Sequence, residues 1–310
     1  MKGIKIISTG IGVPQRIVTN DDLAAIVETS DEWIQQRTGM KERRYLGEGE
    51  NLLQFAKEAA EKAISSSGID KNEIGVILVA TISGDYFTPS MACLLQKELS
   101  LSQDVLAMDI NAACSGFVYG LITMQALLSS TGKEYGILIG AEAISRKLSM
   151  EDRSTCILFG DGAAAAVVKA EEGAAFTSVT GAMGDENLIA CPISDGIVRM
   201  DGKSTYLFAV EKVPAVIRKV TEKAGVSLDD IDHFVLHQAN LRILESVAKK
   251  LSIPMEKVIV NIEKYGNTSG ASVGLALHDL AASGNLKRDD LIILCAFGAG
   301  KTWGAVIMKW

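Results

Sequence analysis

Short, nearly uninterrupted apolar runs alternate along the chain with longer stretches of mixed polarity. Runs such as VILVAT at residues 76–81 and LIILCAF at residues 291–297 contain too little polar alternation for strands with one face in water. We therefore expect helices to cover both faces of these strands. Residues 52–67 and 209–224 have the length of such helices. The pattern predicts an α/β protein built in layers.

The same order of segments occurs twice. GIDKNEIGVILVATIS from Gly68 resembles GVSLDDIDHFVLHQAN from Gly225, an offset of 157 residues (225 − 68). SGFVYGL from Ser115 then matches SGASVGL from Ser269, and further apolar matches follow in the same order. The order indicates a duplication, with a site shared where the strand ends of the two halves meet. The predicted pseudo-symmetric halves are residues 1–172 and 173–310.

One uncharged stretch, residues 110–132, is long enough to cross a bilayer. It also contains asparagine, glutamine, serine and several glycines. These residues suit a helix buried inside a soluble protein better than a membrane span. We therefore expect a central core helix over this stretch and no membrane insertion.

Composition limits the location and the partners. The net charge of −7 argues against general binding of nucleic acid or anionic membranes. Five scattered cysteines without a CxxC pair favour a reducing compartment over a disulfide framework. The opening MKGIKIISTG has no long apolar stretch and is typical of a strand, not a signal peptide. We expect a cytoplasmic protein that binds no nucleic acid.

Cys114 is the strongest candidate for a reactive side chain. It lies in DINAACSGF, between an apolar strand and the uncharged helix. Backbone N–H groups and the positive end of the helix dipole would favour the thiolate there. The alternative, a small buried hydrophobe, is the commoner role of a lone cysteine. We interpret the remaining cysteines in that way: Cys93, Cys156, Cys191 and Cys295.

His237 and Asn267 are the matching candidates in the second half. His237 ends the strand expected in HFVLHQAN, whereas His233 and His278 are expected to be surface or structural residues. Asn267 lies in YGNTSGAS before a helix, one position from the counterpart of Cys114 in the repeat. Its alternative role is a helix N-cap. The duplication predicts that the cysteine, the histidine and the asparagine meet at equivalent corners of the two halves.

The motifs extend over essentially the whole chain. They are TSDEWIQQRTGMKERR from Thr29, ACSGF around Cys114, FGDGAAA from Phe159, HQANLRI, GNTSGAS and AFGAGKTWG. In these segments the chain resembles the β-ketoacyl-acyl carrier protein synthase III family, which starts type II fatty acid synthesis. Elongating synthases and thiolases share the fold but have histidine or cysteine in place of Asn267. Chalcone-type synthases share the three reactive residues but are longer and differ around the glycine loop.

The resemblance implies a duplicated thiolase-like fold, layered αβαβα, and a ping-pong reaction without metal or other cofactor. Cys114 would attack the thioester of an acyl-coenzyme A primer and release coenzyme A. The N–H groups of Cys114 and Ala299 would form the oxyanion hole. Malonyl-acyl carrier protein would then lose carbon dioxide while His237 and Asn267 bind the forming enolate. Attack on acyl-Cys114 would give a β-ketoacyl-carrier protein.

Substrate contacts are also implied by the resemblance. Trp33 and Arg153 would sandwich the adenine of coenzyme A, although a helical tryptophan is more often a core residue. The full set of implied coenzyme A contacts is Thr29, Trp33, Arg37, Arg153 and Asn240. A basic cluster suits an acidic carrier protein, although such clusters are usually solvated helix faces. Its members are Arg242, Lys249 and Lys250.

Three residues depart from the family pattern. Thr88 stands before Pro89 where many members have a phenylalanine that closes the acyl tunnel, so we expect primers longer than acetyl to be accepted. Leu207 occupies a position that can be a lysine near the carrier-protein site. Lys301 follows the glycine loop where an apolar residue is common, and we expect its charge to stay in water.

Two other functions stay open at this point. One is a synthase III-like condensing enzyme of specialised metabolism with a different acceptor. The other is a non-catalytic acyl-binding or scaffold protein, disfavoured because all three reactive residues are present. The resemblance further implies a homodimer, which would cover the apolar segments around Thr88 and Cys93.

Overall fold

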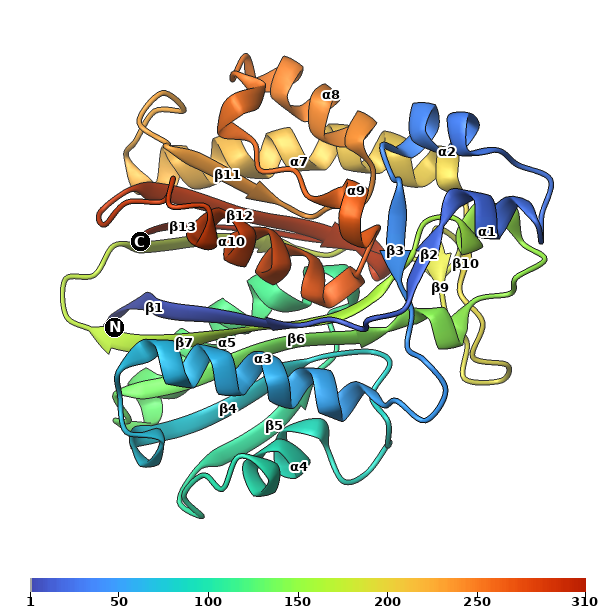
Figure 1. The fold of residues 1–310 in the computed structure, drawn as a ribbon. Coiled ribbons are helices and arrows are strands. Elements are labelled where there is room, and N and C mark those ends of the chain that lie inside the picture. The colour runs from blue at the N-terminus through green and yellow to red at the C-terminus, as the bar shows by residue number, and fades with distance from the viewer. Residues whose placement is uncertain (1) are drawn as a thin grey trace.

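Two β-sheets stacked face to face, with helices between and outside them, form the framework of this computed structural model, which describes residues 2–310 (Figure 1). The first sheet has the strand order β1-β7-β6-β4-β5 and the second has the order β11-β12-β13-β8. The first comprises β1 (Gly3–Gly12), β7 (Asp161–Glu171), β6 (Tyr135–Ala143), β4 (Ile74–Ala80) and β5 (Leu106–Ile110). The second comprises β11 (His233–Leu236), β12 (Leu291–Gly298), β13 (Thr302–Lys309) and β8 (Phe176–Gly181).

Among the paired strands of the two large sheets, the parallel pairs are those that lead toward the site. In the first sheet β4 pairs in parallel with both β5 and β6, and in the second β11 pairs in parallel with β12. The other pairs are antiparallel. Every residue of β4 is buried, as the run without polar alternation predicts for a strand covered on both faces.

Helices cover both faces of each sheet, which gives five layers (Figure 1). Helices α5 and α10 lie between the sheets, and their apolar side chains join those of both sheets in one core. The middle layer is α5 (Gly116–Thr131) and α10 (Ser272–Ala282). The outer layers are α3 (Leu52–Ser67) with α4 (Met91–Glu98), and α7 (Gly202–Ala224) with α8 (Leu241–Leu251).

Capping residues fix the ends of the long helices. Asn51 and Gln54 form a capping box at the start of α3. Three helices end at a glycine in the left-handed conformation, Gly68 after α3, Gly132 after α5 and Gly225 after α7. These glycines stop each helix just before the turn that leads into the next strand.

Small elements gather at one end of the molecule, to the right in Figure 1. They include the hairpin β2 (Ile17–Thr19) and β3 (Glu42–Arg44), with α1 (Asn20–Ala24) and α2 (Asp31–Thr38) between its strands. The others there are β9 (Ile189–Ala190), β10 (Arg199–Met200), α6 (Arg153–Cys156) and α9 (Ile262–Tyr265). The short 3-10 helices are η1 (Lys71–Glu73), η2 (Ala113–Ser115), η3 (Ile144–Lys147), η4 (Met255–Lys257), η5 (Ser269–Ala271) and η6 (Ala299–Lys301).

The duplication extends to the turns that precede the two middle helices. The turn η2 runs directly into α5 and the turn η5 into α10, and each starts at a residue with positive φ. The φ angle is 45° at Ala113 and 47° at Ser269. The turns are therefore offset by 156 residues (269 − 113), and the structural counterpart of Cys114 is Gly270. We propose 1–172 and 173–310 as the halves, a boundary in the loop between β7 and β8.

Two helix starts differ from the expectation. Residues 110–132 do not form one helix, because β5 includes Ile110, η2 follows, and α5 begins only at Gly116. Helix α7 begins at Gly202 rather than at residue 209, since Asp201 caps it through the N–H of Ser204. Among residues 2–310 one helical segment, Ala113–Thr131, is long and apolar enough to cross a bilayer, and 56% of its most apolar window is buried.

Candidate active site

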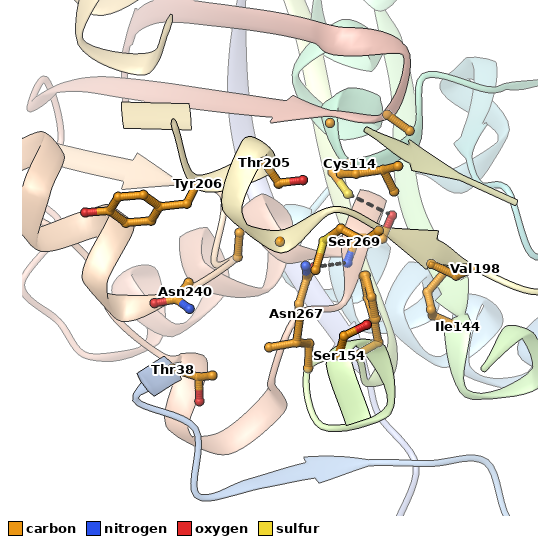
Figure 2. A pocket seen from close by; sticks show the side chains of 18 of the residues that line it. Thr38, Cys114, Ile144, Ser154, Val198, Thr205, Tyr206, Asn240, Asn267 and Ser269 are labelled. Atoms are coloured by element: carbon orange, nitrogen blue, oxygen red, sulfur yellow. Dashed lines mark hydrogen bonds between the residues drawn. The ribbon is translucent and has the colours of Figure 1, made fainter. Parts of the chain in front are cut away.

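A cavity of about 820 Å³ opens where the two halves meet, and the three predicted reactive residues line it. Cys114 comes from η2 in the first half, while His237 and Asn267 come from the second half. In Figure 2, Cys114, Ser269 and Asn267 lie together, with Asn240 and Thr38 farther along the cavity wall. The structure therefore brings together the side chains that the sequence placed at equivalent corners.

Cys114 lies on the cavity wall with only 7% of its surface exposed. Its Sγ donates a hydrogen bond to Ser269 Oγ at 3.4 Å. Burial raises the pKa of the Cys114 thiol to about 11, whereas the Ser269 hydrogen bond lowers it and the charge of Glu142 raises it further. The structure does not favour the thiolate as expected, because burial outweighs the donors at the helix start.

The glycine loop after β12 packs directly against Cys114. A Cβ atom added at Gly298 would lie 2.9 Å from the Cβ of Cys114 and 3.0 Å from its backbone nitrogen. Only a glycine permits this approach, which carries the next residue, Ala299, onto the cavity wall beside the sulfur. This arrangement supports, as a proposal, an oxyanion hole formed by the N–H groups of Cys114 and Ala299.

His237 follows the last residue of β11 and is 2% exposed. Its backbone N–H donates to the carbonyl of Cys295 at 2.8 Å, and its ring meets the ring of Phe297 edge to face at 5.4 Å. Among the described residues Nδ1 has no hydrogen-bond partner. Burial lowers the pKa of His237 to about 3, so the ring is neutral near pH 7 and offers one N–H donor.

Asn267 is held by hydrogen bonds on both sides of its peptide unit. Its N–H donates to Leu158 at 2.8 Å, and its carbonyl accepts from Gly160 at 3.0 Å. The side-chain Oδ1 accepts from the N–H of Ser269 at 2.9 Å, a bond drawn in Figure 2. The amide oxygen is thus committed to the turn, which leaves the amide N–H groups as donors toward the cavity. Asn267 is therefore not an N-cap, since Thr268 precedes η5.

Sequence reasoning missed two polar residues behind Cys114. Ser269 accepts from the cysteine and its Oγ donates to Glu142 Oε1 at 3.4 Å. Glu142, near the end of β6, is completely buried. The available signal was a single carboxylate in an otherwise apolar strand, GILIGAEA, because a buried charge requires partners.

The residues expected at the nucleotide of coenzyme A lie at the outer end of the cavity. The guanidinium carbon of Arg153 lies 4.9 Å from the centre of the Trp33 ring, and that of Arg37 lies 5.8 Å from it. Asn240 caps α8 and donates to the carbonyl of Arg37 at 3.1 Å. All four line the cavity, whereas Thr29 does not, and its hydroxyl is buried without a hydrogen-bond partner among the described residues.

The expected basic cluster lies on the exposed side of α8. Arg242 is exposed and also lines the cavity. Lys249 and Lys250 are exposed near the end of the helix, and Lys250 donates to the carbonyl of Val210 at 2.9 Å. The cluster therefore extends from the cavity along one outer helix. Leu207, on α7, is also exposed.

Thr88 does not line the cavity of its own chain. It lies in the exposed loop between β4 and α4, beside Phe87, which is 97% exposed. Lys301 lies neither in the cavity nor free in water. Its Nζ forms an ion pair with Asp185 Oδ2 at 2.5 Å, and this pair links the glycine loop to the segment after β8.

The remaining cysteines and histidines have varied environments. Cys156 and Cys295 are buried as expected, but Cys93 is exposed and Cys191 is a half-buried residue of the cavity wall. His233 lies 3.4 Å from Asp290, and His278 shares a hydrogen bond with Thr9 at 3.0 Å, which fits structural roles. Within residues 2–310 no group of three or more histidine, cysteine or acidic side chains is placed to hold a metal ion.

Two family models match this chain. One, described as 3-oxoacyl-[acyl-carrier-protein (ACP)] synthase III C terminal, matches residues 221–310. The other, described as 3-oxoacyl-[acyl-carrier-protein (ACP)] synthase III, matches residues 108–184. The matched ranges contain Cys114, His237 and Asn267.

Similar proteins extend over the full chain. Beta-ketoacyl-[acyl-carrier-protein] synthase III of Aquifex aeolicus is 44% identical over 99% of this chain and 100% of its own length. The protein of that name from Clostridium acetobutylicum is 39% identical over 100% of this chain and 99% of its own.

Solved structures agree with the sequence comparison. The crystal structure of the Aquifex aeolicus synthase III superposes with a TM-score of 0.95 over 99% of this chain and 100% of that one. The priming beta-ketosynthase from the R1128 polyketide biosynthetic pathway has a TM-score of 0.94 at 30% identity, over 99% of this chain and 96% of that one. The duplicated thiolase-like fold expected from the sequence is thereby confirmed.

Proposed function

Because the chain belongs to the 3-oxoacyl-[acyl-carrier-protein] synthase III family, acyltransferase-class condensing enzymes of fatty acid biosynthesis, we propose that Cys114 carries the acyl group in the initiating condensation. The observation that supports this proposal is the meeting of Cys114, His237 and Asn267 on one cavity wall. Residues from both halves are required, so neither half holds a complete site.

In the first half-reaction the sulfur of Cys114 attacks the thioester carbon of an acyl-coenzyme A primer. The oxyanion that forms accepts hydrogen bonds from the N–H groups of Cys114 and Ala299. Coenzyme A then leaves as its thiolate, and the acyl group stays on the sulfur. The close contact between Gly298 and Cys114 supports this pairing, because it sets the glycine loop against the nucleophile.

In the second half-reaction malonyl-acyl carrier protein loses carbon dioxide and forms an enolate. A neutral His237 ring and the amide of Asn267 each donate a hydrogen bond to the enolate oxygen. These donors suit a developing negative charge because their other atoms are buried or already committed. The carbanion attacks acyl-Cys114, and the product leaves as β-ketoacyl-carrier protein. The scheme uses no metal and no redox cofactor.

The substrate contacts follow the cavity outward. Trp33, Arg153, Arg37 and Asn240 line its outer end and would hold coenzyme A, with Arg153 moving off Trp33 to admit the adenine. Thr29 does not line the cavity, so its contribution to coenzyme A binding would be indirect. Arg242 at the cavity, with Lys249 and Lys250 farther along α8, presents positive charge that fits an acidic carrier protein. We further propose a cytoplasmic homodimer.

A synthase III-like enzyme of specialised metabolism with a different acceptor is the second candidate. It is favoured by the similarity to the R1128 priming ketosynthase, whose TM-score of 0.94 is close to the 0.95 of the Aquifex aeolicus synthase III. The acceptor separates the two functions. A panel of acyl-coenzyme A primers assayed with malonyl-loaded fatty-acid carrier protein would yield β-ketoacyl product if the first function is correct. Acyl transfer to the enzyme without that product would favour the second.

The covalent intermediate is tested by mixing the protein with radiolabelled acyl-coenzyme A and locating the label by mass spectrometry. We expect one acyl group on Cys114 and none in Cys114→Ala. Cys93→Ala is the matched control, since this exposed cysteine lies on α4 outside the cavity. Stable acylation of Cys114→Ala would overturn the assignment, and a lack of label on the parent protein would favour a non-catalytic acyl-binding role.

A further inference from the structure

Behind the nucleophile, three polar side chains form a continuous hydrogen-bonded chain that ends at a buried carboxyl group. Cys114 Sγ donates to Ser269 Oγ at 3.4 Å, and Ser269 Oγ donates to Glu142 Oε1 at 3.4 Å. All three residues are buried. Figure 2 shows the first of these bonds, with the sulfur directed at the serine hydroxyl. His237, by contrast, makes no hydrogen bond to the sulfur.

The two oxygens of Glu142 have different surroundings. Oε2 accepts from the N–H of Ile82 at 3.1 Å, from Thr81 Oγ1 at 3.4 Å and from Ser83 Oγ. The hydroxyl of Ser83 is the donor here, because an ionised carboxylate can only accept, and the hydroxyl oxygen in turn accepts from the N–H of Ala143 at 2.8 Å. Oε2 is therefore saturated with donors, and a proton that arrives at the carboxylate goes to Oε1, the oxygen that faces Ser269.

Two glycines make room for this approach. A Cβ atom at Gly270 would lie 2.9 Å from Glu142 Oε1, and one at Gly140 would lie 2.5 Å from the carbonyl oxygen of Gly270. Ser269 itself has a φ of 47°, a conformation that costs energy for a residue with a side chain. The turn η5 thus keeps an unfavourable backbone geometry in which the serine hydroxyl lies between the thiol and the carboxylate.

We propose that Glu142 accepts the proton of the Cys114 thiol through the hydroxyl of Ser269 when the primer binds. The inference rests on the proposed function of Cys114 as the acyl carrier. Ser269 touches the reacting sulfur, whereas Glu142 acts through Ser269 and is a positioning residue for the proton.

Glu142 accepts the proton of Cys114 in the first half-reaction and returns it in the second. As the bond between sulfur and the acyl carbon forms, the thiol proton passes to Ser269 Oγ, and the serine proton passes to Glu142 Oε1. Coenzyme A leaves as a thiolate and takes a proton from water. When the carbanion later expels Cys114 as a thiolate, protonated Glu142 returns its proton through Ser269. Both residues are thereby reset without another reactant.

The acid strengths and neighbouring charges fit this exchange. Burial raises the pKa of Glu142 to about 7, against the lowering effect of the Ser83 and Ile82 hydrogen bonds. The charge of Glu142 raises the pKa of Cys114 and also that of Cys191, so the carboxylate and the thiolate disfavour each other and share one proton. The other groups nearby are neutral His237 on the cavity wall and Asp161 on β7, which binds Ser145 and Leu46.

The test is the pH dependence of single-turnover acylation of Cys114 by acyl-coenzyme A, followed by quenching and mass spectrometry from pH 5.5 to 10. In the parent protein we expect the rate to rise through about pH 7 with the ionisation of Glu142. In Glu142→Gln and Ser269→Ala the rate at pH 7 should fall at least roughly tenfold and should then rise only toward the pKa of the thiol. Glu142→Asp and Ser269→Thr should recover part of the loss.

Matched controls separate the relay from folding and from binding. Asp109→Asn removes another partly buried carboxylate, one that caps α4, and should leave the pH profile unchanged. Coenzyme A affinity and thermal unfolding check that each variant binds and folds. A folded Ser269→Ala with the parent pH profile overturns the relay even if Glu142→Gln fails to fold. If the parent itself carries no acyl group on Cys114, the proposed function fails instead.

Discussion

His237 and Asn267 face the same cavity, but their hydrogen bonds suit the second half-reaction and not the first. Neither donates to the sulfur of Cys114, whose hydrogen-bond partner is Ser269. His237 is neutral because burial lowers its pKa to about 3, and the amide oxygen of Asn267 is committed to the turn. Both residues therefore offer N–H donors that a forming enolate oxygen can accept.

We expect His237→Ala and Asn267→Ala to acylate Cys114 at close to the parent rate. Each should decarboxylate malonyl-carrier protein roughly 100-fold more slowly or worse, because one preorganised donor to the forming oxyanion is lost. Single-turnover acylation and carbon dioxide release, measured on the same preparations, check both halves. Release at the parent rate in both variants would contradict the assigned roles.

The buried carboxyl of Glu142 also makes a prediction about stability. Its pKa is raised from 4.5 to about 7, so between these values the folded protein retains a proton that the unfolded chain releases. The contribution of this group is fully present below pH 4.5 and falls as the pH rises through 7. The rise of the pKa from 4.5 to about 7 corresponds to about 3 kcal/mol.

Glu142→Gln carries no titrating group at this position. The free energy of unfolding of the parent, minus that of the variant, should therefore fall by about 3 kcal/mol between pH 4.5 and pH 8. Urea unfolding over this range measures the difference. A difference that is constant with pH would show that Glu142 does not titrate as its burial requires.

At the residue scale, the sequence predicted which side chains would meet on the cavity wall where a residue type and its motif were enough. Cys114, His237 and Asn267 could be predicted because each follows a strand or precedes a helix in a distinctive segment. The protonation of Cys114 could not, because it depends on burial between two halves that are distant in sequence. Glu142 was missed for the same reason, since its partner Ser269 lies 127 residues away.

At the scale of elements, the repeat predicted the order of strands and helices but not their register. Sequence matching aligned Ser115 with Ser269, whereas the turns η2 and η5 align Ala113 with Ser269. The two alignments differ because the left-handed residue that starts each turn is alanine in one half and serine in the other. Under the structural register Asn267 corresponds to Asn111. The duplication thus predicted that these residues meet at one cavity, although its sequence register is two positions off the structural one.

The glycine loop is an element whose position depends on an ion pair. Gly300 and Lys301 both have positive φ, at 70° and 46°. Lys301 is bound to Asp185, whose Oδ1 in turn accepts from the N–H groups of Asn187 and Leu188 at 2.7 and 2.9 Å. We infer that this pair holds the loop against Cys114 and so positions the N–H of Ala299.

Lys301→Met retains the length of the side chain but removes the ion pair. We expect acylation of Cys114 to slow roughly tenfold, because a slightly misplaced oxyanion donor stabilises the transition state less. Coenzyme A affinity should change little, since Lys301 does not line the cavity. Lys219→Met, an exposed position on α7, is the matched control and should match the parent. Parent-like acylation by Lys301→Met would show that the pair is not needed to hold the loop.

At the scale of the whole molecule, one edge strand of the first sheet is unpaired on its outer side among the described residues. Strand β5 ends the strand order and has no neighbour on its outer side among the described residues. Met108 on this strand is exposed, and so are Tyr86 and Phe87 in the loop that follows β4. This loop starts beside the end of β5, because the N–H of Thr81 donates to the carbonyl of Ile110 at 3.2 Å. Unpaired backbone beside exposed apolar side chains is a surface that pairs readily with another strand. We propose that a second copy of the chain covers it.

In this dimer Thr88 would lie at the acyl tunnel of the other protomer. Because Thr88 does not line the cavity of its own chain, we propose that it limits primer length in the cavity of the other protomer. We expect the parent to be a dimer by sedimentation and to accept primers longer than acetyl, because each buried methylene contributes about 0.8 kcal/mol until the space is full. Thr88→Phe should narrow this range toward acetyl in the dimer.

Met108→Lys, which places a charge on the edge strand, should produce monomers in which Thr88→Phe no longer changes the chain-length preference. If Thr88→Phe alters the chain-length preference equally in monomers, the effect of Thr88 arises within one chain. A parent protein that is monomeric at micromolar concentration would refute the dimer itself.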